Sequence, residues 1–374
     1  MSQLFNCLLQ RLPSSPRIAV IRALQLGDVL CAVPAWRALR AAVPSAEVTF
    51  IGLPWAQEFV SRFNTYFDAF REFPGYRGIP EQTQDGVRLR DFCEAAAREP
   101  YDLVIQMHGS GWDINDFMRD LGARRNAGFY PEGAPCPDHD AFLSYPDRVS
   151  EVERHLLLME HLGAPPQGSH LEFPVLSRDE EQYQELVQRL SLKPQQFVCL
   201  HAGARWPSRR WPADRFAEVG DVLTAYGYQI VLTGSSSEVE LVAAVSNQMR
   251  AQHFNLAGQT GLGVMVRMLH DARLVISNDT GMSHLAAAAR TPSVVIVMGS
   301  DPHRWAPLNR GRHRTVMQPI DCRPCNHFVC PIGQECALLV TPEHVLTTAR
   351  TLLNDAKHHR ILDVPSRLVS LTTL

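Results

Sequence analysis

The sequence predicts an α/β protein with two doubly wound, largely parallel sheets, and three observations lead to this prediction. Short apolar, β-branched runs alternate with helix-patterned segments, which is typical of parallel sheets covered by helices. The alternation starts near residue 18 and restarts after Pro194. The chain has 374 residues, more than one ordinary core accommodates, so two domains are expected.

The first half is predicted to hold three strands and two helices. Apolar runs predict strands at residues 18–21, 47–52 and 101–106. Apolar residues at helical spacing predict helices at residues 29–42 and about 54–63. The turn Leu26-Gly27-Asp28 joins the first strand to the first helix, and Pro44 follows that helix as a stop signal.

The second half repeats the pattern. Strands are expected at residues 196–200, 228–233, 273–277 and 293–297. Helices are expected at residues 212–226, 238–249 and 262–270. An acidic helical segment over 177–194 is the expected boundary, between domains at 1–180 and 190–345. Ligands of open α/β sheets bind at the carboxyl ends of the strands, so a cleft between two such edges is the expected site.

The composition excludes a broadly basic nucleic-acid binder, because the net charge is −3. With 45% hydrophobic and 20% charged residues, the chain is expected to be a soluble globular protein. No apolar stretch reaches the roughly 20 residues that span a bilayer, and residues 1–17 do not resemble a signal peptide, so a cytoplasmic location is expected. Of the 36 cationic residues only Lys193 and Lys357 are lysines, so 34 are arginines, which suit bidentate contacts with phosphate or carboxylate.

The most informative stretch runs from Ser277 to Leu285 and is followed by a run of alanines. It comes directly after a predicted buried strand and begins a small-sided helix. Asp279, Thr280 and Gly281 therefore stand at a helix start, where free N–H groups favour an anion such as phosphate. Asp279 could be the helix N-cap, and His284, one turn further on, could face either the anion or the core.

Asp28 follows the first predicted strand at the edge of the expected cleft. Its carboxylate could cap the following helix, or it could act as a general base that removes a proton from an acceptor hydroxyl. Arginines 205, 209 and 210 follow another strand and could clamp a diphosphate, or they could stack on Trp206 and Trp211. Glu238 and Glu240 open a later helix, where they could bind ribose hydroxyls or simply stabilise the helix.

Four of the nine cysteines lie in one loop-like segment with the spacing C-x2-C-x4-C-x5-C. These are Cys322, Cys325, Cys330 and Cys336. The spacing is close to that of small structural metal sites, so a structural zinc or iron is one interpretation. The other is a loop whose cysteines pack at the domain surface.

Several common motifs are absent from the sequence. No G-x-G-x-x-G follows the first strand, which leaves a nicotinamide cofactor unsupported, and no P-loop motif is present. No G-x-S-x-G nucleophile elbow is present either.

Taken together, these residues resemble the ADP-heptose:lipopolysaccharide heptosyltransferases of glycosyltransferase family nine. The resemblance covers most of the chain. Its motifs are Leu26–Leu30 followed by Pro34, then Arg209–Pro212, Thr233–Ser236 and Asn278–Leu285. It implies a GT-B fold, in which an N-terminal acceptor domain and a C-terminal nucleotide-sugar domain, both Rossmann-like, face a central cleft. It also implies that residues 346–374 return as a helix or tail to the first domain.

The resemblance assigns roles to individual residues. Asp28 would be the base of an inverting, metal-independent transfer that needs no cofactor. Asp279, Thr280, Gly281 and His284 match the diphosphate-binding motif. Arg209, which stands where a lysine is usual in the family, and Arg210 would also bind the donor. Glu238 or Glu240 would hold the ribose, and Thr260 would lie near the adenine. Some family members have a cysteine loop similar to that of this chain.

The expected partners are a nucleotide-sugar donor and a lipid-linked or other glycan acceptor, with no nucleic acid. The family acceptor is the lipopolysaccharide core, so peripheral contact with the cytoplasmic face of the inner membrane is expected. Candidates to bind an anionic core sugar are Arg62, Arg119, Arg124 and Arg125. Two alternatives remain open: a nucleotide-sugar epimerase of related fold, and a non-catalytic, metal-stabilised binding protein.

Overall fold

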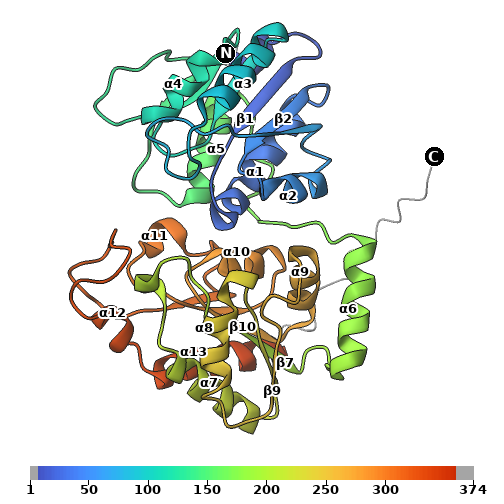
Figure 1. Cartoon of the computed structure of the whole chain (residues 1–374), viewed down its shortest axis with the longest axis vertical. Helices are drawn as coiled ribbons and strands as arrows, with labels where there is room; N and C mark the ends of the chain where they lie inside the picture. Colours follow the sequence, from blue (N-terminus) through green and yellow to red (C-terminus); the bar gives the residue numbers. More distant parts are fainter. Residues whose placement is uncertain (1–6, 359–374) are drawn as a thin grey trace.

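The computed structural model describes residues 7–358 and contains two parallel six-stranded sheets, each flanked by helices (Figure 1). Each sheet forms the centre of its own domain, and the two domains lie one against the other (Figure 1). The predicted architecture of two doubly wound domains is therefore confirmed.

The first sheet has the strand order β3-β2-β1-β4-β5-β6. Its strands are β1 Arg17–Ile21, β2 Glu47–Gly52, β3 Ala69–Glu72, β4 Leu103–Gln106, β5 Asn126–Tyr130 and β6 Phe142–Ser144. The run Ile18–Ile21 of β1 is completely buried, since β1 lies in the middle of the sheet and helices cover both faces. The sequence pattern missed β3, β5 and β6, which are short and carry polar residues.

The second sheet repeats this topology in the order β12-β11-β10-β7-β8-β9. Its strands are β7 Phe197–His201, β8 Gln229–Leu232, β9 His253–Asn255, β10 Leu274–Asn278, β11 Ser293–Ile296 and β12 His313–Val316. In both sheets the order reverses beside the first strand of the domain, between β1 and β4 and between β7 and β10. Such a switch point opens a crevice at the carboxyl ends of the strands. The segments after β1, β7 and β10 carry most of the predicted site residues.

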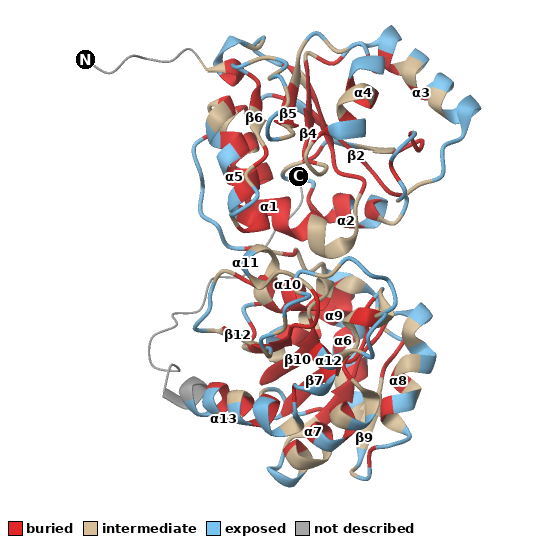
Figure 2. Ribbon diagram, turned by 90° about the vertical axis from the view of Figure 1, so that its left-hand side faces the viewer, coloured by how far each residue is buried: buried red, intermediate tan, exposed pale blue. Residues whose placement is uncertain are grey.

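The helices of the first domain cover both faces of its sheet (Figure 2). They are α1 Leu26–Ala42, α2 Ala56–Arg62, α3 Gly86–Arg98, α4 Trp112–Asp120 and α5 Glu151–Leu162, with a 3-10 turn at Leu8–Arg11. Helix α5 begins with a capping box, in which Ser150 accepts from the Glu153 backbone N–H and Glu153 from that of Ser150. It ends at Gly163, whose φ of 101° suits glycine.

The second domain has more helices and two short 3-10 turns. The helices are α6 Ser177–Leu190, α7 Ala213–Ala225, α8 Val239–Ser246, α9 Leu262–Asp271, α10 Gly281–Ala288, α11 Pro302–Trp305, α12 Glu335–Leu338 and α13 Pro342–His358. The 3-10 turns are Pro207–Arg209 and Ser236–Glu238. Helix α6 packs along α9, where Tyr183 Oη donates to Asp271 Oδ2 at 2.9 Å. The chain thus enters the second domain before α6, slightly earlier than the predicted limit at residue 180.

The C-terminal helix does not pack where the resemblance implied. Helix α13 lies against α7, β10, β11 and β12 of the second domain. Its residues Val345, Leu346 and Ala349 are buried in that core, and Arg273 Nη2 donates to the Leu353 carbonyl. The expected return to the first domain is therefore wrong for residues 346–358, because the apolar face of this helix completes the second core. Residues 359–374 lie outside the described part of the chain.

The two domains touch where α1 and α10 cross (Figures 1 and 2). Met282, Leu285 and Ala286 of α10 are buried in one continuous apolar cluster with residues of α1. The helix that follows β1 therefore packs against the helix that follows β10. No helix within residues 7–358 is long and apolar enough to cross a membrane.

Candidate active site

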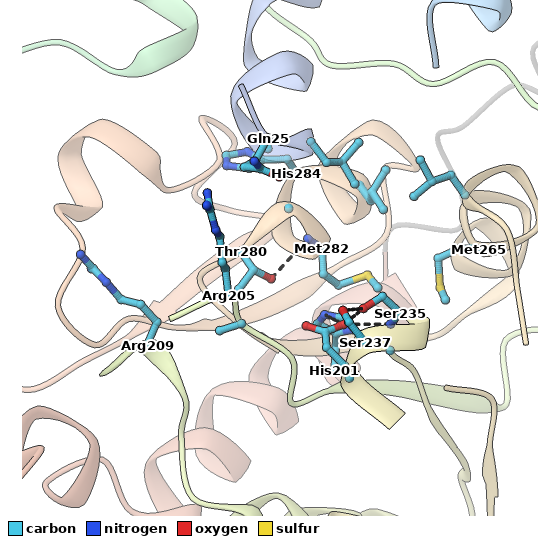
Figure 3. A pocket seen from close by; sticks show the side chains of 18 of the residues that line it. Gln25, His201, Arg205, Arg209, Ser235, Ser237, Met265, Thr280, Met282 and His284 are labelled. Atoms are coloured by element: carbon cyan, nitrogen blue, oxygen red, sulfur yellow. Dashed lines mark hydrogen bonds and ion pairs between the residues drawn. The ribbon is translucent and has the colours of Figure 1, made fainter. Parts of the chain in front are cut away.

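A cavity of about 1140 Å³ lies between the carboxyl edges of the two sheets. The first domain contributes Gln25 to Asp28 at the start of α1 and Glu58 of α2. The second domain contributes the segments that follow β7, β8 and β10 (Figure 3). All the donor-side residues predicted from the sequence except Glu240 line this cavity together with Asp28.

Asp28 reaches the cavity as the third residue of α1, and Gln25 is the N-cap. Asp28 is thus not the N-cap residue, although its carboxylate accepts a hydrogen bond from the backbone of Gln25. The backbone carbonyl of Asp28 accepts from Arg22 Nε at 2.7 Å, which fixes the first turn of the helix. Burial raises the pKa of the Asp28 carboxyl, while Arg22 counteracts this and Glu151 adds to it. A carboxylate with a raised pKa is a better proton acceptor than a free one.

The turn after β10 places the Asp279–Gly281 motif against the start of α10. Thr280 is the N-cap, and its Oγ1 accepts from the Met282 N–H (Figure 3). The prediction that Asp279 is the N-cap is therefore wrong. Asp279 instead accepts a hydrogen bond from Ser300 Oγ. Burial raises the pKa of Asp279, while Ser300 and Arg209 oppose the shift.

Asn278 holds this turn in place from within the core. Its Nδ2 donates to the Ala202 carbonyl at 2.8 Å, and its Oδ1 accepts from the Trp211 N–H at 3.1 Å. The amide therefore ties β10 to the loop after β7. One buried side chain therefore links two of the loops that form the second domain's wall of the cavity.

His284, which is labelled in Figure 3, lies at the contact between the domains, where a Cβ built on Gly27 of α1 would lie 3.0 Å from its Cδ2. Its side chain lines the cavity, and its Nδ1 lies 3.6 Å from Cys31 Sγ of α1. Burial lowers the pKa of His284 to about 4, so the imidazole is neutral at pH 7. The ring is therefore buried in the interface and also forms part of the cavity wall, while its predicted contact with an anion stays a prediction.

Arg209 and Arg210 line the cavity after β7. Arg209 Nη2 donates to the Cys325 carbonyl, while its buried Nη1 has no hydrogen-bond partner within residues 7–358. A buried guanidinium nitrogen without a partner is suited to a bound anion. Arg210 Nε donates to the Ala204 carbonyl at 2.9 Å. Arg205 is exposed at the cavity mouth (Figure 3).

The stacking alternative applies to one arginine only. The Arg209 guanidinium lies 5.7 Å from the centre of the Trp206 ring. Trp211 is buried and its Nε1 donates to the Val340 carbonyl at 2.9 Å, so it is a core residue rather than a platform.

Glu238 borders the cavity floor. Its Oε2 accepts from the Ser235 N–H at 2.8 Å and lies 4.0 Å from His201 Nε2. Burial favours the neutral acid, but His201 and Ser235 outweigh it, so the pKa of Glu238 is lowered. A Cβ at Gly203 would lie 2.1 Å from Glu238 Oε1 and 2.7 Å from His201 Nε2, so a larger residue there would displace these two side chains. Glu240 is exposed and does not line the cavity, whereas Thr260 does, with a buried Oγ1 that has no partner in the described residues.

Comparison with known proteins places the chain in a family. The model of glycosyltransferase family 9 (heptosyltransferase) matches residues 90–335. The chain belongs to this family. The lipopolysaccharide heptosyltransferase 2 of Salmonella typhimurium is 26% identical over 358 residues, covering 91% of this chain and 99% of that protein. The resemblance inferred from the motifs is confirmed, and the chain is a glycosyltransferase.

Solved structures support the fold. A family 9 glycosyltransferase from Veillonella parvula superposes with a TM-score of 0.74 at 22% identity, covering 91% of this chain and 97% of that one. ADP-heptose lps heptosyltransferase II of E. coli gives 0.67 at 21% identity, covering 91% and 99%. The GT-B prediction for this family 9 glycosyltransferase is therefore confirmed.

The four arginines predicted to bind the acceptor do not come together, and none lines the cavity of this family 9 enzyme. Arg62 is buried and both of its terminal nitrogens donate to Asp179, which makes it an ion pair between α2 and α6. Arg119 lies in the last turn of α4 and pairs with Asp116 of the same helix. Arg124 and Arg125 precede β5, so they lie at the opposite edge of the sheet from the cleft. The positions of these four arginines therefore give no support to their expected role in acceptor binding.

The cysteine segment also differs from the metal interpretation. Cys322 is exposed, Cys325 and Cys330 are partly buried, and Cys336 is buried. Within residues 7–358 no three His, Cys, Asp or Glu side chains lie together as metal ligands. The backbone of Cys325 instead donates to the Gly299 carbonyl at 2.7 Å and accepts from Arg209. The segment therefore positions a cavity arginine through main-chain contacts.

The side chains of the cavity wall that sequence reasoning missed include His201, Ser300 and Trp305. His201 is the last residue of β7, and its Nδ1 lies 3.1 Å from Thr233 Oγ1. The signal that could have identified His201 is its position at the end of a buried strand, because polar residues at the ends of such strands gather at the same edge of the sheet. Trp305 gave no signal of this kind, since it ends the short helix α11, whose position depends on packing.

Proposed function

We propose that this protein transfers a heptose from ADP-heptose to the lipopolysaccharide core, with inversion at the anomeric carbon and Asp28 as general base. The observation that carries the proposal is that Asp28 and the Asp279–Gly281 turn line one cavity from opposite domains. An inverting displacement needs the base and the leaving group on opposite sides of the anomeric carbon. The two walls of this cavity offer that arrangement.

The leaving group of this reaction is a nucleoside diphosphate, on which negative charge grows as the glycosidic bond breaks. We assign its stabilisation to the N-terminus of α10 and to Arg209 and Arg210. The unpartnered Arg209 Nη1 supports this assignment. These groups supply the positive charge that the diphosphate needs, so the proposal gives no step to a metal ion.

ADP is the proposed nucleotide because a structural relative carries ADP-heptose in its name and the cavity is suited to a nucleoside. Glu238, rather than Glu240, would accept from the ribose hydroxyls, since only Glu238 borders the cavity. Thr260 would meet the adenine, and its unpartnered Oγ1 supports a polar ligand there.

The acceptor is proposed from the relatives, which are named as lipopolysaccharide heptosyltransferases. Such an acceptor is lipid-linked, so we infer that the enzyme acts at the cytoplasmic face of the inner membrane. Co-sedimentation with vesicles that carry the acceptor would test this location, and equal binding to vesicles without acceptor would contradict it.

Incubation with ADP-heptose and a heptose-deficient lipopolysaccharide core tests the activity. The proposal expects ADP release that depends on the acceptor. The variant Asp28→Asn should bind ADP normally and lose about a hundredfold or more in kcat, because a general base contributes factors of this size. Full activity of Asp28→Asn would exclude its role as base. Donor turnover without acceptor would favour an epimerase, and ADP binding without any turnover would favour a binding protein.

A further inference from the structure

A buried ionic cluster around Glu151 joins the two domains behind the proposed base. Glu151 opens α5 and is 3% exposed. Its carboxylate contacts the guanidinium groups of Arg22 and Arg154 from its own domain and that of Arg304 from the other. Burial alone would raise the pKa of Glu151, but His155, Arg22 and Arg304 hold it well below the usual range. The carboxylate is therefore charged in the folded protein.

Arg22 connects Glu151 to Asp28. Its side chain is fully buried, and each of its three nitrogens donates to one oxygen. Nε donates to the Asp28 carbonyl at 2.7 Å, Nη2 to Glu151 Oε1 at 3.1 Å, and Nη1 to the Met107 carbonyl. The planar guanidinium thus fixes the start of α1 relative to the end of β4 and the start of α5.

Arg304 connects Glu151 to the donor side of the cavity. Its Nε donates to Glu151 Oε2 at 2.9 Å and its Nη2 to Tyr145 Oη at 3.0 Å. The same short segment carries Ser300, which donates to Asp279 of the proposed diphosphate motif. It also carries Trp305, which lines the cavity and whose ring lies 4.6 Å from the Arg304 guanidinium. One segment of the second domain therefore touches both Asp279 and Glu151.

We infer that Glu151 is a positioning residue that couples closure of the two domains to the placement of Asp28, an inference that rests on the proposed function. Arg304 reaches Glu151 only when the second domain lies against the first. Without Arg304, the Glu151 carboxylate keeps only the contacts from its own domain, with Arg22, Arg154 and His155. Arg22 then loses the geometry that holds the first turn of α1, so the base is correctly placed only in the closed enzyme.

The variant Arg304→Met tests the coupling, because it removes the contact and leaves the buried Glu151 carboxylate in place. The Arg304 side chain is 32% exposed at the domain contact, so its replacement leaves the core intact. We expect kcat to fall about tenfold to a hundredfold with the ADP dissociation constant changed less than about threefold, because small misplacements of a reacting group have effects of this size. Arg304→Lys should recover part of kcat. A loss confined to ADP affinity would overturn the inference and make Arg304 a donor ligand.

A double-mutant cycle separates coupling from an independent effect. In the Glu151→Gln background, Arg304→Met should lower kcat by less than about twofold further, because both act through one contact. Equal effects of Arg304→Met in both backgrounds would overturn the inference. The matched control is Arg98→Met, which removes a solvent-exposed ion pair with Glu94 within α3, away from the cavity. It should leave kcat within about twofold of the unmodified enzyme.

Hydrogen–deuterium exchange gives a measurement that does not depend on transfer. Addition of ADP should protect the amides of residues 25–31 in the unmodified protein and leave them unprotected in Arg304→Met. Equal protection in both proteins would overturn the inference. A protein that shows this ADP-dependent difference but transfers no heptose would disprove the proposed function alone.

Discussion

Gly27 of α1 and Gly281 of α10 meet across the boundary between the two domains. A Cβ built on Gly27 would lie 3.4 Å from the Gly281 Cα and 3.0 Å from His284 Cδ2. Two backbones approach here without a side chain between them. This contact sets how near Asp28, one residue after Gly27, can come to the donor motif that begins with Asp279.

The first prediction concerns this contact. Gly27→Val should hold the domains apart and lower kcat/KM by about tenfold or more, since branched methyl groups cannot fit against Gly281 and His284. Small-angle scattering with and without ADP, together with steady-state kinetics, would measure the effect. Gly86→Ala is the control, because a Cβ there meets nothing within 4 Å. Unchanged kinetics in Gly27→Val would mean that close approach is not needed.

Arg209 provides a second prediction. Arg209→Met should weaken ADP binding by about tenfold and adenosine binding by less than about twofold, because the unpartnered Nη1 is assigned to the diphosphate. Arg209→Lys should fall between, since an ammonium keeps the charge but cannot also bind the Cys325 carbonyl with a second nitrogen. Calorimetry with both ligands separates these outcomes. Equal losses for ADP and adenosine would place the arginine elsewhere in the nucleotide site.

The structure also distinguishes two neighbouring acids that the sequence left as alternatives. Glu238→Gln should weaken ADP binding by about fivefold to tenfold, whereas Glu240→Gln should leave it unchanged, because only Glu238 borders the cavity. The loss should largely disappear with 2′,3′-dideoxy-ADP, which lacks the ribose hydroxyls. A loss of the same size with that analogue would contradict a hydrogen bond to ribose.

A fourth prediction concerns stability in acid. Burial and Arg312 lower the pKa of His313 to about 4 from an ordinary value of 6.5. The unfolded chain therefore binds a proton that the native protein does not, so the free energy of unfolding falls as pH drops from 6.5 towards 4. In His313→Asn that fall should be smaller by up to about 3 kcal/mol. Urea unfolding at several pH values measures it, and parallel curves for both proteins would contradict the assignment.

Much of the donor site was predictable because its residues follow strands directly. The run before Asn278 identifies a buried strand, and residues after such strands must gather at one sheet edge. Asp28 and Asp279 were found in this way. Their local roles were not, since whether Gln25 or Asp28 caps a helix depends on where the helix starts, which shifts by a residue or two with packing.

Long-range partners were beyond the sequence. Arg62 was assigned to an acceptor, but it pairs with Asp179, 117 positions away. Glu151 gave no signal of its own, although it contacts arginines from both domains. An arginine has the same local pattern whether it meets a ligand or a buried carboxylate, and only the folded arrangement decides between them.

The sequence by itself determined the two-domain α/β fold, the family, and the strand ends that carry Asp28 and the Asp279–Gly281 turn. Those features depend on hydrophobic period and on short motifs, which are local. The tertiary structure alone decided that α13 completes the second core, that Cys325 holds Arg209 through its backbone, and that Arg304 pairs with Glu151. These depend on how distant segments pack, and close packing rather than local pattern determines which groups meet.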